Sequence, residues 1–235
     1  MRISIFQACP VLGAALGFAM LAFDAQPRAA ALAAGGTVEG HVTVVSRPTR
    51  RLSSAGAYPG RSVTVGPSGA GSELPNVVVF VDLPTPVSSA PDRATIRQVD
   101  EVFSPRVVAV STGSTVEFPN DDPIFHNVFS LSRAATFDLG RYPRGQSKSQ
   151  RFERPGVVKV FCHFHSHMTA LVRVFDHPYF AIPDASGRFV ISGVPAGSRR
   201  VVAWHERVGE VAHAVPVVDG ATAAVTFALP LTDPR

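Results

Sequence analysis

The apolar residues of this chain come in short runs that glycine and proline interrupt, and this pattern constrains the fold most. The clearest run is Val77–Val81, which has the length of a buried strand and is too short for a core helix. Nineteen glycines and 20 prolines stand among such runs, and turn residues at this density join strands rather than helices. With 46% hydrophobic residues and a length of 235, the chain is predicted to be all-β, with one or two domains.

Strand signals recur along the chain between turn residues. In Gly36–Val44, small or polar residues alternate with β-branched ones, which predicts a strand. Residues 46–74 are rich in Ser, Gly, Pro and Arg and predict a long loop. Further strands are expected at Arg106–Val110, Thr115–Phe118, Asn127–Leu131, Ser147–Phe152, Val157–Phe161, Ala170–Val174, Phe189–Ile191, Arg200–His205, Val211–Val218 and Thr222–Ala228. The close spacing between 95 and 174 indicates a β-sandwich of about 80 residues.

The N-terminal segment has the composition of a secretory signal peptide. Arg2 precedes the apolar stretch Ile3–Phe23, and the alanine-rich tract Ala29–Ala34 offers Ala-x-Ala cleavage sites. We therefore expect cleavage of residues 1–33, a periplasmic or secreted location, and no membrane span in the mature chain. The alternative is an uncleaved anchor, because about 20 apolar residues can cross a bilayer.

The basic residues do not cluster. The net charge is +4 and no basic run exceeds two residues, whereas a nucleic-acid surface needs a concentrated patch or stripe of charge. The sequence therefore predicts that nucleic acid is not a partner.

Cys162 is the one cysteine left after the predicted cleavage, because Cys9 lies in the signal peptide. A lone thiol in an oxidising compartment is a liability unless it is buried or bound. The segment Phe161–Met168 combines this thiol with three imidazoles and a thioether. One Cys, two His and a weak axial Met form the ligand set of blue copper.

The spacing around Cys162 suits such a site. In the pattern Cys-x-x-His-x-x-Met, one tight loop supplies Cys162, His165 and Met168. A fourth ligand then has to come from a neighbouring strand, and His126 stands at the mouth of one.

These residues resemble the cupredoxins. The likeness is carried by Val116–Asn120, His126–Phe129, Gly156–Cys162, His165 and Met168, and the most similar type is the plastocyanin- or amicyanin-like, methylamine-utilisation type of secreted bacterial protein. The resemblance covers about residues 94–175 and implies a Greek-key β-sandwich. It also implies one type 1 copper ion with His126, Cys162, His165 and Met168 as ligands. It further implies that Asn127 ties the two ligand loops together by hydrogen bonds.

The remaining histidines are expected not to bind this copper. His163 and His167 stand where prolines or other non-ligating residues are usual in the family. An azurin-like Cys-x-x-x-x-His spacing would make His167 the ligand, but residue 171 is then leucine where methionine is expected. His205 is expected at the surface or in packing, and His41, His177 and His213 show no ligand spacing.

Enzymatic functions fit the sequence less well. A multicopper oxidase needs several paired histidines and a His on each side of the Cys, but Phe161 precedes Cys162. A Cys-His hydrolase leaves Met168 unexplained, and structural zinc usually takes four Cys or His ligands. We therefore expect a single-electron carrier that is not an enzyme, monomeric, with an unidentified redox partner protein in the periplasm. Phe125 and Phe164 would give that partner an apolar rim.

Two other functions stay open at this point. The histidine-rich loop also suits copper storage or delivery. Alternatively, the copper site is structural and the flanking sequence binds a partner protein or a glycan.

That flanking sequence resembles a carboxypeptidase regulatory-like, transthyretin-type sandwich. The likeness rests on Gly36–Val42, Asn76–Val81, and the segments from Asp184 to Trp204. It predicts a discontinuous domain of residues 35–90 and 176–235, with the copper domain 94–175 inserted at a surface loop. The alternative is two consecutive domains, in which residues 36–90 add strands to the copper domain.

Overall fold

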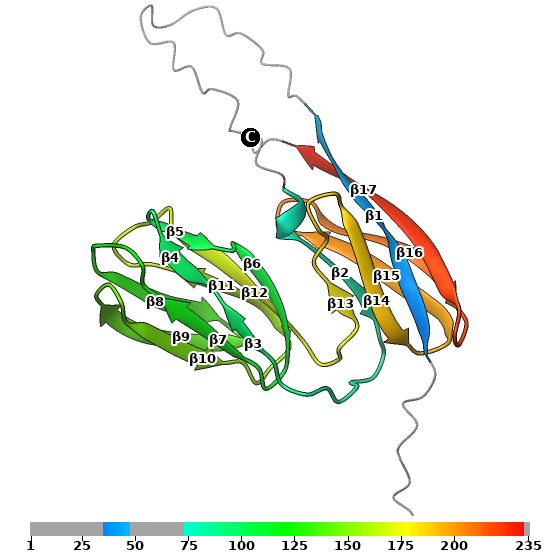
Figure 1. The fold of residues 1–235 in the computed structure, drawn as a ribbon, viewed down its shortest axis with the longest axis horizontal. Helices are drawn as coiled ribbons and strands as arrows, with labels where there is room; N and C mark the ends of the chain where they lie inside the picture. Colours follow the sequence, from blue (N-terminus) through cyan, green and yellow to red (C-terminus); the bar gives the residue numbers. More distant parts are fainter. Residues whose placement is uncertain (1–34, 48–72, 233–235) are drawn as a thin grey trace, which may run out of the picture. The chain divides into compact units, whose positions relative to one another are not determined.

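The computed structural model of the protein describes residues 35–47 and 73–232. The predicted signal peptide, 1–33, and most of the predicted loop, 46–74, lie outside these ranges. Within them the chain forms strands and one 3₁₀ turn, η1 (Leu74–Asn76). The strands are β1 (Gly36–Arg47), β2 (Val77–Asp82), β3 (Arg93–Thr95), β4 (Arg97–Val99), β5 (Val102–Ser104), β6 (Val107–Ser111), β7 (Thr115–Pro119), β8 (His126–Ser132), β9 (Ala135–Tyr142), β10 (Ser147–Arg151), β11 (Gly156–Phe161), β12 (Thr169–Phe175), β13 (Phe180–Ala181), β14 (Arg188–Val194), β15 (Gly197–His205), β16 (Gly209–Val217) and β17 (Thr222–Thr232) (Figure 1). The prediction of an all-β chain is confirmed.

Strands β3 to β12 build the part of the fold that holds the candidate site. One sheet has the order β6-β12-β11-β8-β9, a second has the order β10-β7-β3, and β4 and β5 form a separate hairpin. Side chains alternate between the two faces of a strand, so β7 buries Val116 and Phe118 and leaves Glu117 between them partly exposed. These two buried residues join Val128 and Val158 in one apolar core.

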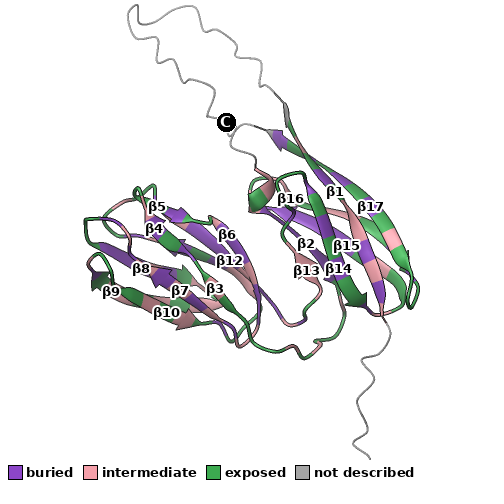
Figure 2. Ribbon diagram, viewed as in Figure 1, coloured by how far each residue is buried: buried purple, intermediate pink, exposed green. Residues whose placement is uncertain are grey.

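Strands from the two ends of the chain pair with one another in two further sheets, β14-β1-β17 and β13-β2-β15-β16. All residues of Val77–Val81 are buried (Figure 2), as a continuous apolar run requires. β1 runs parallel to β17, and at Gly40 a Cβ atom would lie 1.7 Å from the carbonyl oxygen of Val225. Glycine is therefore the residue that permits this close pairing.

The expected strands correspond to observed ones within a few residues, but four short strands and the eight-residue β9 were not predicted. These are β3, β4, β5, β9 and β13. The hairpin of β4 and β5 has only three residues in each strand, too few for an alternating pattern to emerge. In β9 the apolar Phe137 and Leu139 alternate as expected, but Asp138 and Gly140 weaken the strand signal.

Across residues 35–47 and 73–232, no helix is long and apolar enough to cross a membrane.

Candidate metal centre

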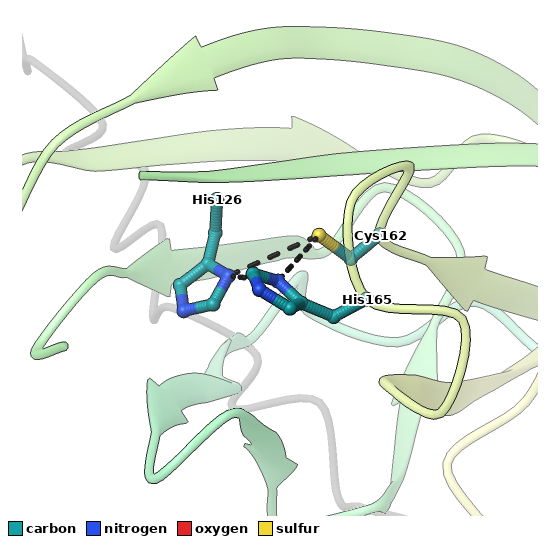
Figure 3. Close-up of side chains that lie close together, drawn as sticks. All are labelled: His126, Cys162 and His165. Atoms are coloured by element: carbon teal, nitrogen blue, oxygen red, sulfur yellow. Dashed lines mark hydrogen bonds between the residues drawn. The ribbon is translucent and has the colours of Figure 1, made fainter. Parts of the chain in front are cut away.

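Three strand ends position the predicted ligands. His126 is the first residue of β8, and Cys162 directly follows β11. These strands are neighbours in one sheet through the pair Phe129 and Phe161, so His126 and Cys162 lie at the same end of the sheet. His165 lies in the short loop between β11 and β12, and this loop turns back so that the imidazole faces Cys162 (Figure 3).

The donor atoms of these residues converge. The Sγ atom of Cys162 lies 3.9 Å from Nδ1 of His126 and 3.8 Å from Nδ1 of His165. The two Nδ1 atoms are 3.1 Å apart (Figure 3). Among the described residues, this is the one group of three or more His, Cys, Asp or Glu side chains with the spacing of a metal site.

The spacing suits one small metal ion in contact with all three donors. Nitrogen and sulfur ligands lie about 2.0–2.3 Å from such an ion, so two of them can be no more than about 4.5 Å apart. The separations of 3.1–3.9 Å meet this condition. His126 is 0% exposed and Cys162 4%, so the group lies in the interior and can hold a metal ion there.

Met168 closes the loop that carries Cys162 and His165. Its backbone N–H donates to the carbonyl oxygen of His165 at 2.9 Å. The side chain is buried in the same apolar cluster as Cys162. The residue predicted as the axial ligand therefore lies inside the fold, in one cluster with the predicted thiolate.

Asn127 connects β8 with the loop that contains the other ligands. Its Oδ1 atom accepts a hydrogen bond from the backbone N–H of His163 at 3.3 Å. Its Nδ2 atom donates to the carboxylate of Asp138 on β9 at 2.6 Å. Asn127 is itself buried, so these bonds hold the strand of His126 and the loop of Cys162 against each other.

The other loop histidines lie away from the group. His163 is exposed, and its ring packs on that of Phe129 with the centroids 3.9 Å apart. His167 is also exposed, with Nε2 3.9 Å from the carboxylate of Glu101. His205 is buried, which agrees with a packing role.

Sequence reasoning missed Asp122, which contacts a predicted ligand directly. Its Oδ2 atom lies 2.7 Å from Nε2 of His126, and both side chains are buried. Burial by itself raises the pKa of Asp122, but hydrogen bonds from the Glu101 N–H, His126 and the Asp100 N–H outweigh it and lower the pKa below its usual value. The available signal was the position of Asp122 four residues before His126.

The carboxylate determines which nitrogen of His126 is free. Asp122 is an acceptor, so the Nε2 atom of His126 carries the proton and its Nδ1 atom presents a lone pair toward Cys162. Without a metal, the Nδ1–H of His165 can donate to that lone pair across 3.1 Å. A metal ion would take the place of this proton.

Apolar side chains are exposed around the loop that precedes His126. Ile124 and Phe125 from this loop and Phe164 from the ligand loop have 38%, 48% and 55% of their surface exposed. The guanidinium of Arg141 lies 4.6 Å from the ring centroid of Phe125 and 5.8 Å from that of Phe164. The predicted apolar rim is thus exposed and carries one positive charge.

Comparisons with known proteins give partial structural likenesses. No family model matches the chain, and no curated protein matches it. A copper-containing nitrite reductase from Thermus scotoductus SA-01 is similar over 39% of this chain, with 24% identity and a TM-score of 0.34. The chain spans only a quarter of that protein's length.

Two small copper proteins are similar over nearly their whole length. A purple cupredoxin from Nitrosopumilus maritimus matches with 28% identity and a TM-score of 0.32, covering 34% of this chain and 98% of its own. A mutant of amicyanin in its Cu(I) form matches with 18% identity and a TM-score of 0.33, covering 41% of this chain and 97% of its own.

Proposed function

We propose that this chain is a secreted, periplasmic type 1 copper protein that carries single electrons and is not an enzyme. The observation that carries the proposal is the buried group of one thiol and two imidazole Nδ1 atoms. His126, Cys162 and His165 would hold the copper, with Met168 as a weak axial ligand. When bound, copper supplies a one-electron couple, and this donor set is the one that supports blue-copper electron transfer.

The burial of the ligands favours electron transfer over copper delivery. A chain that hands its metal to another protein needs ligands that the acceptor can reach. Here His126 and Cys162 are enclosed, and His165 is the most exposed of the three, with 22% of its side-chain surface accessible. The edge of the His165 ring therefore offers an electron a short path to the surface while the metal stays enclosed.

A redox partner protein would dock on the exposed rim formed by Ile124, Phe125, Phe164 and Arg141. Apolar contact with few charges suits a small, weak and transient interface. The guanidinium of Arg141, stacked near Phe125, would favour an acidic group at the edge of the partner's patch. Between encounters we propose that the chain is a monomer.

We also propose that residues 35–90 and 176–235 form one regulatory-like domain with residues 94–175 inserted. The strand pairs β1 with β14 and β17, and β2 with β13 and β15, support this division. Expression of residues 94–175 alone tests it. A folded fragment that binds copper is expected, and an unfolded one would contradict the proposal.

Copper titration of the purified protein tests the function. One equivalent of Cu(II) should give an intense visible band from thiolate-to-copper charge transfer, and voltammetry should show a reversible one-electron couple. A colourless copper complex, or a protein that takes zinc in preference to copper, would contradict the proposal. A blue protein without a reversible couple would contradict the electron-carrier role alone.

A further inference from the structure

The two imidazoles of the metal group are both backed by a carboxylate, but in different surroundings. Behind His126, the Oδ2 atom of Asp122 lies 2.7 Å from Nε2, and the two side chains are 0% and 5% exposed respectively. Behind His165, the Oε2 atom of Glu101 lies 3.7 Å from Nε2 and the Glu101 side chain is 49% exposed. Only the first pair is a close hydrogen bond shielded from water.

The fold fixes the orientation of the buried carboxylate. Asp122 accepts hydrogen bonds from the backbone N–H groups of Asp100 at 2.6 Å and Glu101 at 3.0 Å. Together with His126, three donors therefore surround it, and its own N–H donates to Oδ1 of Asn120 at 3.0 Å. A carboxylate held in this way cannot rotate its negative charge away from the imidazole.

The hairpin that supplies two of these donors contains two residues in a disfavoured backbone conformation. Asp100 and Glu101 form the two-residue turn between β4 and β5, with φ angles of 53° and 56°. Residues other than glycine are disfavoured in this left-handed region, because Cβ then lies too close to the following carbonyl oxygen. Both N–H groups donate to Asp122, so the contact with the carboxylate offsets the cost of the turn.

We propose that Asp122 is a positioning residue that holds His126 with its Nδ1 lone pair toward the metal and lowers the reduction potential of bound copper. The second part rests on the proposed function. A negative charge in a poorly solvated site stabilises Cu(II) more than Cu(I), because its attraction grows with the charge of the ion. Hydrogen bonding from a metal-bound histidine to a carboxylate also raises the basicity of the imidazole. Both effects favour the oxidised metal.

The variant Asp122→Asn removes the negative charge of the side chain while nearly keeping its shape. Its amide oxygen can keep the bond to His126, while the carboxylate charge is lost. The control is Asp121→Asn, which removes the same charge one residue away, where the carboxylate pairs with Arg97 at the surface. Loss of one outer hydrogen-bonding partner typically changes metal affinity about 10- to 100-fold.

We expect Asp122→Asn to stay blue and to lower the ratio of Cu(II) to Cu(I) affinity about tenfold, which for one electron raises the reduction potential by about 59 mV. Asp121→Asn should leave the potential at the wild-type value. Equal potentials for the two variants would overturn the tuning role of Asp122.

Two measurements test the positioning role if the protein is not blue, and the second of them requires no variant to fold. Zinc affinity of the metal-free protein should fall about tenfold in Asp122→Ala, which removes the hydrogen-bond partner of His126, and stay unchanged in Asp121→Ala. Long-range ¹H–¹⁵N spectra of the metal-free wild-type protein should show His126 protonated at Nε2. The Nδ1–H tautomer, or equal zinc affinities in the two variants, would overturn the positioning role independently of the copper chemistry.

Discussion

The interiors of the two parts of this molecule differ in how many polar side chains they bury. In the part built from β1, β2 and β14 to β17, the core consists of apolar residues such as Val79, Phe227 and Leu229. In the part built from β3 to β12, an apolar core of similar kind lies beside a set of buried polar groups. Eight of the ten buried polar side chains in the described ranges lie between Gln98 and Ser130, on the segments that surround His126 in the sequence.

This difference indicates where selection for function overrides selection for stability. A buried polar group costs free energy unless it is hydrogen-bonded, so an unspecialised sandwich minimises such groups. Asp122 and Asn127 are both buried and hydrogen-bonded, and both lie within four residues of His126. We expect the effects of a substitution in one part to stay confined to that part.

Cys162→Ser should have the largest effect. A hydroxyl cannot supply the covalent character of the copper–thiolate bond, so the blue colour should disappear completely. The two side chains differ little in volume, and the stability of the metal-free protein should fall by at most about 1–3 kcal/mol, the cost of an incompletely bonded buried hydroxyl. Visible spectra of the copper-loaded protein and thermal unfolding of the metal-free protein measure the two outcomes. A variant that stays blue would require another sulfur ligand.

His165→Ala should disrupt the centre almost as much. The imidazole facing Cys162 is lost, so the blue band should vanish or become sensitive to exogenous ligands, with added imidazole restoring it in part. His167→Ala is the matched control and should leave the spectrum unchanged, because its ring lies outside the donor group. A blue His165→Ala together with a colourless His167→Ala would show that the other histidine is the ligand.

Glu101→Gln should have a smaller effect than either. Its carboxylate lies 3.7 Å from the His165 imidazole and is half exposed, so solvent and salt screen its charge. The backbone N–H that donates to Asp122 is kept. We expect a rise in reduction potential that is smaller than that of Asp122→Asn and that shrinks further as ionic strength increases. A shift equal to that of Asp122→Asn would mean that burial does not distinguish the two carboxylates.

Phe227→Ala should leave the metal centre unchanged while destabilising the protein. Phe227 is fully buried in the apolar core of the other part, and truncation of such a side chain costs about 3–5 kcal/mol. Denaturant unfolding should register this loss, whereas the visible spectrum and the potential of the folded variant should match wild type. A changed spectrum would show that the two parts are coupled.

Much of this arrangement was predictable from the sequence, because the relevant signals are local. The run Val77–Val81 and the spacing of Cys162, His165 and Met168 each lie within a few residues. The proximity of His126 to Cys162 was implied by the resemblance to the cupredoxins. The orientation of the Asp122 carboxylate was not predictable in this way, because two of the N–H groups that fix it belong to a hairpin 21–22 residues earlier in the chain. Hydrogen bonds between such distant segments leave no periodicity in the sequence.

Copper K-edge X-ray absorption of the loaded protein reports the atoms bound to the metal and therefore tests the proposed ligand set. We expect one short copper–sulfur bond and two imidazole nitrogens around one copper ion, with the sulfur contribution absent in Cys162→Ser. A shell of nitrogen and oxygen atoms alone in the wild-type protein would contradict this ligand set.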